Sequence, residues 1–268
     1  MTMPVHPVLF ADAREAADLA AFLGRLLHYD RAAAVRLQAA GGALAVFGRP
    51  PSFDVLAIRT ARLAGAGAGS EAGAGSEAGA GTEAGAGTEP GAGTGTGAVA
   101  GPGTGSFDVT VSAGEFLETL DPAGGTGGTG TVPRPVTGPP WAGMLPPRGP
   151  WREVPGLPGP QELRTALSTA VGEFRSRDGA LPEERRTRTE RDLIGREIWS
   201  RPVGGTPLPL RAVHAAHSLG FLRPQPGLPV HLLSSGSWLR LRTPYGSVAL
   251  RTAGSGGLGA LQVSVGRR

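Results

Sequence analysis

The chain has 268 residues, a formal net charge of +4, 45 glycines and 25 prolines, with no cysteine and no lysine. Without cysteine it cannot form a disulfide, a thiol nucleophile or a cysteine-ligated zinc site. Without lysine it has no Schiff base, no P-loop lysine and no kinase ATP lysine.

The charge is divided unevenly along the chain. Residues 1–150 have a net charge of −4, and residues 151–268 have a net charge of +8. Glu197 is the last acidic residue, and the 71 residues after it contain eight arginines and three histidines. Such a segment favours an anionic partner, most commonly nucleic acid. A solvated basic face, or docking of the basic half on the acidic half, agrees with the same pattern.

The N-terminal residues lack the basic start and apolar run of a signal peptide. The sequence contains no run of about 18 apolar residues, so no transmembrane helix is predicted. The expected location is the cytoplasm, without a membrane partner, which suits a chain without cysteine.

The first part of the chain predicts a helix followed by an antiparallel sheet. Asp12, with Glu15 three residues later, resembles a capping box, and apolar residues recur at helical spacing to about residue 28. Four apolar segments predict strands at 34–38, 43–48, 53–63 and 107–111. Ser112 is expected to cap a short helix that ends near residue 120.

Residues 64–105 form a low-complexity tract in this region. They include AGAGSE twice and AGAGTE twice. The glutamate of each copy repels its neighbours, which predicts a flexible, solvated loop instead of stacked strands. Because closure entropy rises slowly with length, the tract is expected to join the strands at 53–63 and 107–111 as an expanded hairpin loop.

The second part predicts an arm followed by a basic module. Residues 122–159 are rich in glycine, threonine and proline, and Trp141 and Trp151 are expected to dock this linker or arm onto a domain. Apolar periodicity predicts helices at 160–179, from Pro182 and at 208–219. Strands are expected at 230–233, 238–243, 247–252 and 261–265.

The turn at residues 243–246 joins two of these strands. Proline followed by glycine suits a three-residue loop, whereas side-chain alternation suits a two-residue loop that pairs Leu241 with Leu250 and Arg240 with Arg251. We follow the alternation. It places Leu239, Leu241, Val248 and Leu250 on one face and Trp238, Arg240, Arg242 and Arg251 on the other.

Three helices followed by a β-hairpin resemble a winged-helix domain over about residues 160–252, and the whole chain resembles proteins of high-GC actinobacteria. In winged-helix domains the third helix enters the DNA major groove and the hairpin touches the backbone. The resemblance implies contacts from Arg211, His214, Ala215 and Ser218 on the helix and from Arg240, Arg242 and Arg251 on the wing. The helix offers one arginine and no Asn or Gln, which favours phosphate contacts over base readout.

The sequence contains only weak matches to catalytic, metal-binding and cofactor-binding motifs. His214 and His217 lie three residues apart, but no carboxylate follows them, so no metal site is predicted. Residues 125–130 and 254–259 match GxGxxG outside any βαβ unit, so no cofactor is predicted. Asp54 and Asp108 meet only if their strands pair, and paired acids at strand ends are usually solvated. The sequence therefore predicts no catalytic residue.

The sequence as a whole predicts an α+β protein. Its parts are a domain at 1–121 with an N-terminal helix, an antiparallel sheet and the Gly/Ala-repeat loop, a linker at 122–159, and a basic module of three helices and a hairpin at 160–268. The predicted function is non-catalytic binding of nucleic acid through phosphate contacts of the basic module. The alternative is a protein–protein adaptor that binds no nucleic acid.

Overall fold

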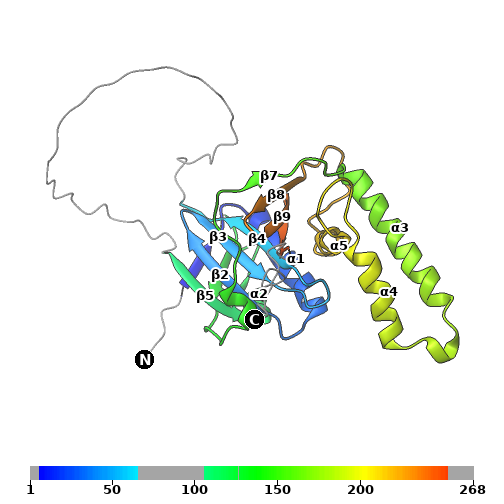
Figure 1. Cartoon of the computed structure of the whole chain (residues 1–268). Helices are drawn as coiled ribbons and strands as arrows, with labels where there is room; N and C mark the ends of the chain where they lie inside the picture. The colour runs from blue at the N-terminus through cyan, green and yellow to red at the C-terminus, as the bar shows by residue number, and fades with distance from the viewer. Residues whose placement is uncertain (1–5, 66–105, 126, 253–268) are drawn as a thin grey trace, which may run out of the picture.

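The computed structural model describes residues 6–65, 106–125 and 127–252. It contains helices and antiparallel sheets, which confirms the α+β class. Figure 1 shows a sheet with a long helical hairpin beside it. Among the described residues, no helix is long and apolar enough to cross a membrane.

The N-terminal elements form close to their expected positions, apart from a first strand at His6–Leu9 that was not predicted. The side chain of Asp12 accepts a hydrogen bond of 2.9 Å from the backbone N–H of Glu15, so the predicted cap is confirmed. Ser112 caps the second helix in the same way, at 3.4 Å. The elements are β1 His6–Leu9, α1 Ala13–Tyr29, β2 Ala34–Ala40, β3 Ala43–Gly48, β4 Leu56–Arg62, β5 Phe107–Ser112 and α2 Ala113–Thr119.

The remaining elements include two short strands and a 3-10 helix within residues 122–159, where only a linker or arm was expected. The later elements follow the predicted order with one difference. The helix expected from Pro182 begins only at Arg188, because Thr187 supplies the capping oxygen that proline lacks. The elements are β6 Thr129–Val132, η1 Pro140–Gly143, β7 Arg152–Glu153, α3 Pro160–Gly179, η2 Glu183–Arg185, α4 Arg188–Ser200, α5 Leu210–Ser218, β8 His231–Ser235, β9 Trp238–Thr243 and β10 Gly246–Arg251. The expected strand at 261–265 and the 254–259 motif lie outside the described residues.

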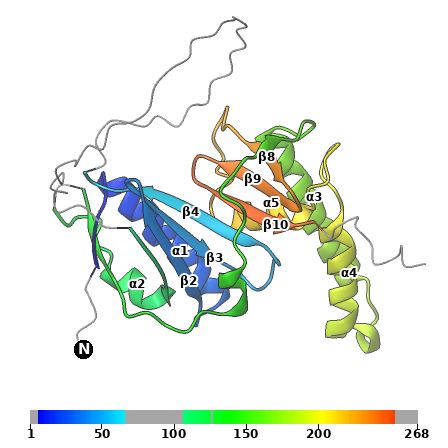
Figure 2. The same cartoon turned by 60° about the vertical axis from the view of Figure 1, so that its left-hand side comes forward.

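Eight strands form one antiparallel sheet in the order β5-β2-β3-β4-β10-β9-β8-β7. The first four come from the N-terminal half of the chain, and the last four come from the C-terminal half. The halves meet where β4 pairs with β10, with Ile58 opposite Ser247 and Leu56 opposite Ala249 (Figure 2). The division into domains at 1–121 and 160–268 stays a prediction, but strand hydrogen bonds join the two segments.

The low-complexity tract does not close a hairpin between its flanking strands. β2 and β3 lie between β4 and β5, so the predicted hairpin is wrong, and Asp54 and Asp108 do not meet. Strands β2, β3 and β4 form a meander and β5 returns beside β2, which is the Greek-key order. The reason is that β10 occupies the free edge of β4. Residues 66–105 of the tract lie outside the described part of the chain.

One face of the sheet is covered by α1, α2 and α5 and forms the main core. Leu37 and Val46 from the N-terminal strands and Leu241 and Val248 from the C-terminal strands are fully buried there. The predicted alternation along β9 and β10 is confirmed, because Leu239 and Leu250 are also buried, and the arginines of these strands fall on the opposite face.

The two-residue loop at Pro244-Tyr245 is confirmed, but the predicted register is wrong by two residues. Leu241 pairs with Val248, and Arg240 pairs with Ala249. A shift of two keeps each side chain on its face, so alternation alone cannot choose between the registers. Thr243 closes the observed turn, because its Oγ1 accepts from the Tyr245 N–H and donates to the Gly246 carbonyl.

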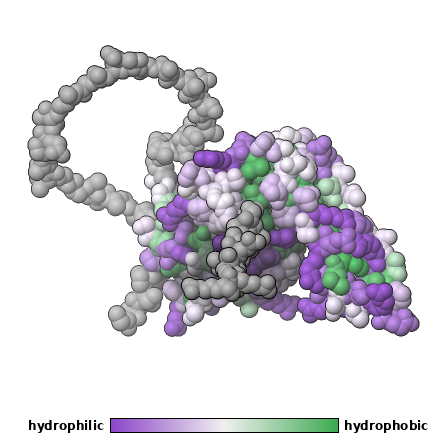
Figure 3. All heavy atoms as spheres, viewed as in Figure 1, coloured by the Kyte–Doolittle hydropathy of each residue, from purple (hydrophilic) through white to green (hydrophobic). Residues whose placement is uncertain are grey.

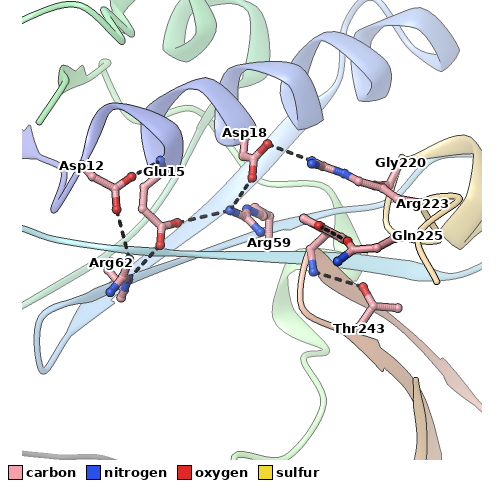
Figure 4. Close-up of polar contacts among 10 residues, drawn as sticks. Asp12, Glu15, Asp18, Arg59, Arg62, Gly220, Arg223, Gln225 and Thr243 are labelled. Atoms are coloured by element: carbon pink, nitrogen blue, oxygen red, sulfur yellow. Dashed lines mark hydrogen bonds and ion pairs between the residues drawn. The ribbon is translucent and has the colours of Figure 1, made fainter. Parts of the chain in front are cut away.

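Ion pairs attach α1 to β4 and to the segment that follows α5 (Figure 4). Arg59 of β4, whose side chain is only 7% exposed, donates to Glu15 at 3.2 Å and to Asp18 at 3.4 Å. Asp18 also accepts from Arg223 at 2.8 Å, and the Arg223 guanidinium lies 3.7 Å from the centre of the Tyr245 ring. Asp18 therefore joins α1 and β4 to the segment that follows α5.

We expect Asp18→Asn to lower the free energy of unfolding by about 2 kcal/mol or more, because it removes the charge that faces two arginines in a largely buried site. Urea unfolding at neutral pH measures this loss. Asp12→Asn is the matched control, since it keeps a capping side chain and disturbs only the exposed pair with Arg62. That change should cost less than about 1 kcal/mol, and equal losses would contradict the role of Asp18.

The Greek-key order predicts how far the 66–105 tract can be shortened. Its ends are three strand spacings apart, about 14 Å. We expect replacement of 66–105 by about eight Gly and Ser residues to preserve cooperative thermal unfolding, because this linker reaches well beyond that span. Ala64 is held by a hydrogen bond to Leu9. Direct fusion of Gly65 to Ser106 then leaves three residue steps, about 10 Å, and should detach β5. Cooperative folding of the fusion would argue against the crossover.

Candidate functional site

The seven predicted nucleic-acid contacts divide between two sides of the sheet. Four lie on α5, which packs against the core face with five of its nine residues buried, Ala215 among them, so the predicted contact from Ala215 is wrong. The other three lie on β9 and β10, on the opposite face. The first set is Arg211, His214, Ala215 and Ser218, and the second is Arg240, Arg242 and Arg251. The structure does not bring the two sets together, because the hairpin is paired on both edges within the sheet instead of standing free as a wing. The winged-helix resemblance stays a prediction based on element order.

Acidic residues from earlier in the chain neutralise part of the positive charge of the segment after Glu197, which has no acidic residue of its own. Arg201 pairs with Glu173 at 2.5 Å and with Glu197 at 3.0 Å. Arg223 pairs with Asp18 from α1. The basic surface is therefore smaller than the count of arginines after Glu197 indicates.

The face opposite α1 contains two neighbouring hollows that share lining residues, and we describe them together as a groove. One, of about 550 Å³, lies over β2, β3 and β4, and the other, of about 800 Å³, lies over β4, β8, β9 and β10. Ile58, Thr60 and Arg240 line both hollows. The groove thus crosses five strand spacings from β2 to β8, about 24 Å.

An arm at residues 139–151 forms one wall of this groove. Trp141 and Leu145 pack on a small apolar cluster of the open face, so the predicted docking of the arm through Trp141 is confirmed. The cluster consists of Phe47, Leu56, Ile58 and Ala249. Trp151 lines the second hollow, and its Nε1–H donates to the Pro147 carbonyl at 3.1 Å. With Trp238, three of the four tryptophans lie on this face.

Arg240 is the central cation of the groove. Its Nε–H donates to the Ser247 hydroxyl at 2.9 Å, and its guanidinium carbon lies 5.8 Å from the centre of the Trp151 ring. Burial, and then the charge of neighbouring Arg242, lower the pKa of Arg240. Among the described residues no carboxylate pairs with either arginine. A partly buried guanidinium without a counter-ion is suited to binding an anion.

The β2 end of the groove is held by an ion pair. The Nε–H and one Nη2–H of Arg36 donate to the two oxygens of Asp108, each at 2.7 Å. This hydrogen bonding lowers the pKa of Asp108. Arg36 also donates to the Ala142 carbonyl and so fixes the arm to the sheet. Arg148 of the arm is an exposed cation at this end.

The opposite end of the groove carries a second pair of charged side chains. His231 Nδ1 lies 3.0 Å from a carboxylate oxygen of Glu153 across the β7–β8 pair. Arg242 lines the same hollow and faces His231 in the strand register. The two ends of the groove are therefore mixed in charge, and its centre is cationic.

Arg36, Arg148 and Trp151 also line this groove and were not among the predicted contacts. The alternation of Val35, Arg36, Leu37 and Gln38 places Arg36 on the polar face of its strand, which is a signal present in the sequence. No such signal shows that β2 and β9 belong to one sheet, since that depends on the β4–β10 pairing.

Metal-ligating side chains do not gather in the described part of the chain, which contains no group of three or more. His214 and His217 point to different surroundings. The His214 ring lies 4.5 Å from the Trp199 ring and 5.0 Å from the Phe53 ring, whereas His217 is exposed. Burial, and then the charge of His217, lower the pKa of His214.

Comparison with protein families divides the chain into two regions. Residues 3–143 match the family model described as domain of unknown function DUF8010, and residues 146–255 match the one described as domain of unknown function DUF8185. The boundary falls within the arm at 139–151, so the β4–β10 pairing joins the two matched regions. No curated protein matches the chain.

The cluster that neutralises Arg201 predicts a pH effect on stability. Hydrogen bonds from Arg177 and Arg201 lower the pKa of Glu197 to about 2, against about 4.3 for an unfolded glutamate. The lowered pKa means that this carboxylate stabilises the fold above about pH 4.3 and loses its effect as the pH falls toward 2. We expect Glu197→Gln to lower the melting temperature at pH 6, and the difference from the unmodified protein to shrink between pH 4 and pH 2. Circular dichroism melts measure both, and a difference independent of pH would contradict the assignment.

Proposed function

This chain belongs to the family described as domain of unknown function DUF8010, and we propose that it binds single-stranded nucleic acid in the groove of its open sheet face without catalysing a reaction. The observation that carries the proposal is Arg240, a partly buried cation that has a hydroxyl and an aromatic ring as neighbours but no carboxylate among the described residues. Such a cation lacks its counter-ion until a phosphate supplies one.

The cations of the groove suit a phosphate backbone. Arg240 and Arg242 project from the same face of β9, two residues apart, and Arg148 lies on the arm along the same groove. Arginine binds phosphate through paired, charge-assisted hydrogen bonds. Contacts of this kind are independent of base sequence and weaken as salt rises.

The aromatic residues favour a single strand over a duplex. Trp151 stands beside Arg240 at 5.8 Å and is only partly buried. Proteins that bind single strands combine a positive groove with aromatic rings on which unpaired bases stack. The groove length of about 24 Å from strand spacing suits a few nucleotides, near the short end of the range for a single sheet-based module.

Location and partners belong to the same proposal. A cytoplasmic location agrees with a chain that has no cysteine. No cofactor or metal is required for binding of this kind. In the alternative hypothesis the protein is an adaptor, and an acidic segment of a partner protein binds to the same arginines in the groove. The test below distinguishes this alternative from nucleic-acid binding.

Fluorescence anisotropy of the full chain with a labelled single strand of about 15 nucleotides, as DNA and as RNA, tests the proposal. We expect binding at about 50 mM salt that weakens steeply by about 200 mM. The double change Arg240→Gln with Arg242→Gln should raise the Kd at least about tenfold and reduce the slope of log K against log salt by about 1.4, the value for two lost phosphate contacts on a single strand.

Arg188→Gln is the matched control, because Arg188 is 95% exposed on α4, away from the sheet, and the change removes one positive charge. It should leave the Kd within about twofold, the effect of a distant charge. Absence of binding at low salt, equal losses in the two variants, or tighter binding of a poly-glutamate peptide than of the oligonucleotides would each overturn the proposal, and the last result would favour the adaptor.

A further inference from the structure

A second cleft, of about 1060 Å³, lies on the other side of the sheet and is lined by residues of the helical hairpin and of the sheet body. α4 and α5 form one side of the cleft, and the end of α1 with the turn at 52–54 forms the other. The cleft contains two of the predicted contacts that the groove leaves unused, Arg211 and His214. Figure 3 shows the nearby hairpin as a mostly hydrophilic surface with a patch of hydrophobic residues.

Aromatic rings form a continuous wall along the cleft. The ring centres of Tyr29 and Phe53 are 5.1 Å apart, those of Phe53 and His214 are 5.0 Å apart, and those of His214 and Trp199 are 4.5 Å apart. Tyr29, His214 and Trp199 are only partly buried, so parts of their rings face the cleft. A wall of this composition is typical of sites for planar organic molecules.

Arg211 supplies an unpaired cation beside this wall. Its Nε is buried and has no hydrogen-bond partner within the described residues. Arg211 also makes no ion pair with any acid there, although two carboxylates line the cleft. Asp54 instead pairs with Arg49, and Asp192 lies 3.9 Å from Arg188. The cation is thus left for a ligand.

A second arginine, Arg196, and a glycine, Gly195, complete the site. The Nε–H of Arg196 donates only to the backbone carbonyl of Asp192, at 3.3 Å, and makes no ion pair in the described ranges. Gly195 is buried in the middle of α4, where glycine costs about 1 kcal/mol relative to alanine. A Cβ there would lie 3.5 Å from Trp199 and 3.7 Å from Phe174. A larger side chain would fill the space between these rings, so glycine keeps the cleft open.

From these contacts we infer that the cleft binds a small molecule with a planar ring and one anionic group, the chemistry of a nucleoside monophosphate or an aromatic carboxylate. The ring packs against the partly exposed rings of Trp199 and His214, and the anion pairs with Arg211 and Arg196. His214 contributes aromatic surface to the cleft. This site is independent of the nucleic-acid groove, which lies on the opposite face of the sheet.

Isothermal titration calorimetry of the full chain with four probes tests the inference: adenosine monophosphate, 2-naphthoate, adenosine and inorganic phosphate. We expect at least one of the first two to bind with a Kd below about 1 mM. Adenosine, which lacks the anion, and phosphate, which lacks the ring, should bind at least about tenfold more weakly than that probe. The stronger of the first two probes shows whether phosphate or carboxylate is the preferred anion.

Two variants locate the binding in the cleft. Arg211→Gln should weaken the bound probe about tenfold by removing the charge-assisted pair, and Gly195→Leu should weaken it comparably by filling the space beside Trp199. Arg14→Gln is the control, because Arg14 is an exposed arginine about 22 Å along α1 from Tyr29. If Gly195→Leu does not fold in a thermal melt, Arg211→Gln alone decides.

Three results would overturn the inference: no binding by either ring-bearing anion, equal binding of adenosine or phosphate alone, or equal effects of Arg211→Gln and Arg14→Gln. Testing each variant in the binding assay of the other site distinguishes the groove from the cleft. Arg211→Gln should leave oligonucleotide anisotropy unchanged, and the Arg240→Gln, Arg242→Gln protein should bind the small probe normally.

Discussion

The pairing of β4 with β10 is the interaction on which the rest of the structure depends. It is the only strand pairing between the two halves in the described residues, and it joins four strands from each half into one sheet. Two layers follow from it. On one side the helices of both halves pack over a common core, and on the other Arg36, Arg240 and Trp151 come to line a single groove although they lie far apart in the sequence. Asp18 reinforces the joint by binding arginines from both halves.

Charge neutralisation decides which arginines are available for a ligand. Those near the helical hairpin and α1, such as Arg201, Arg177 and Arg223, have carboxylate partners and hold elements together. Arg240 and Arg211 have none among the described residues, and each is partly buried beside aromatic rings. Desolvation makes an unpaired cation costly, so these two positions are where an anion would be stabilised most. They lie on opposite faces of the sheet, which is why two ligands of different size are proposed.

The resemblance between the C-terminal half and a winged-helix domain has a physical explanation in the order of its elements. Three helices followed by a hairpin occur as expected, with α4 beginning later than predicted. In this chain, however, α5 contributes Val213 and Ala216 to the main core, and the hairpin is paired with β4 on one edge and β8 on the other. A helix used for packing on a sheet exposes few residues to a major groove.

The sequence by itself determined the elements that depend on local chemistry. These include the capped starts of α1 and α2, the strands at 43–48 and 238–243, the two-residue turn, and the assignment of Arg240 and Arg242 to the polar face of β9, because caps, turns and alternation act over a few residues. Only the tertiary structure decided what depends on long-range pairing. That includes the Greek-key position of β5, the register of β9 with β10, the joining of the halves, and the separation of Arg211 from Arg240. A register shift of two residues leaves the alternation of side chains between the two faces unchanged, so alternation cannot determine the register. It also does not show which strands become neighbours.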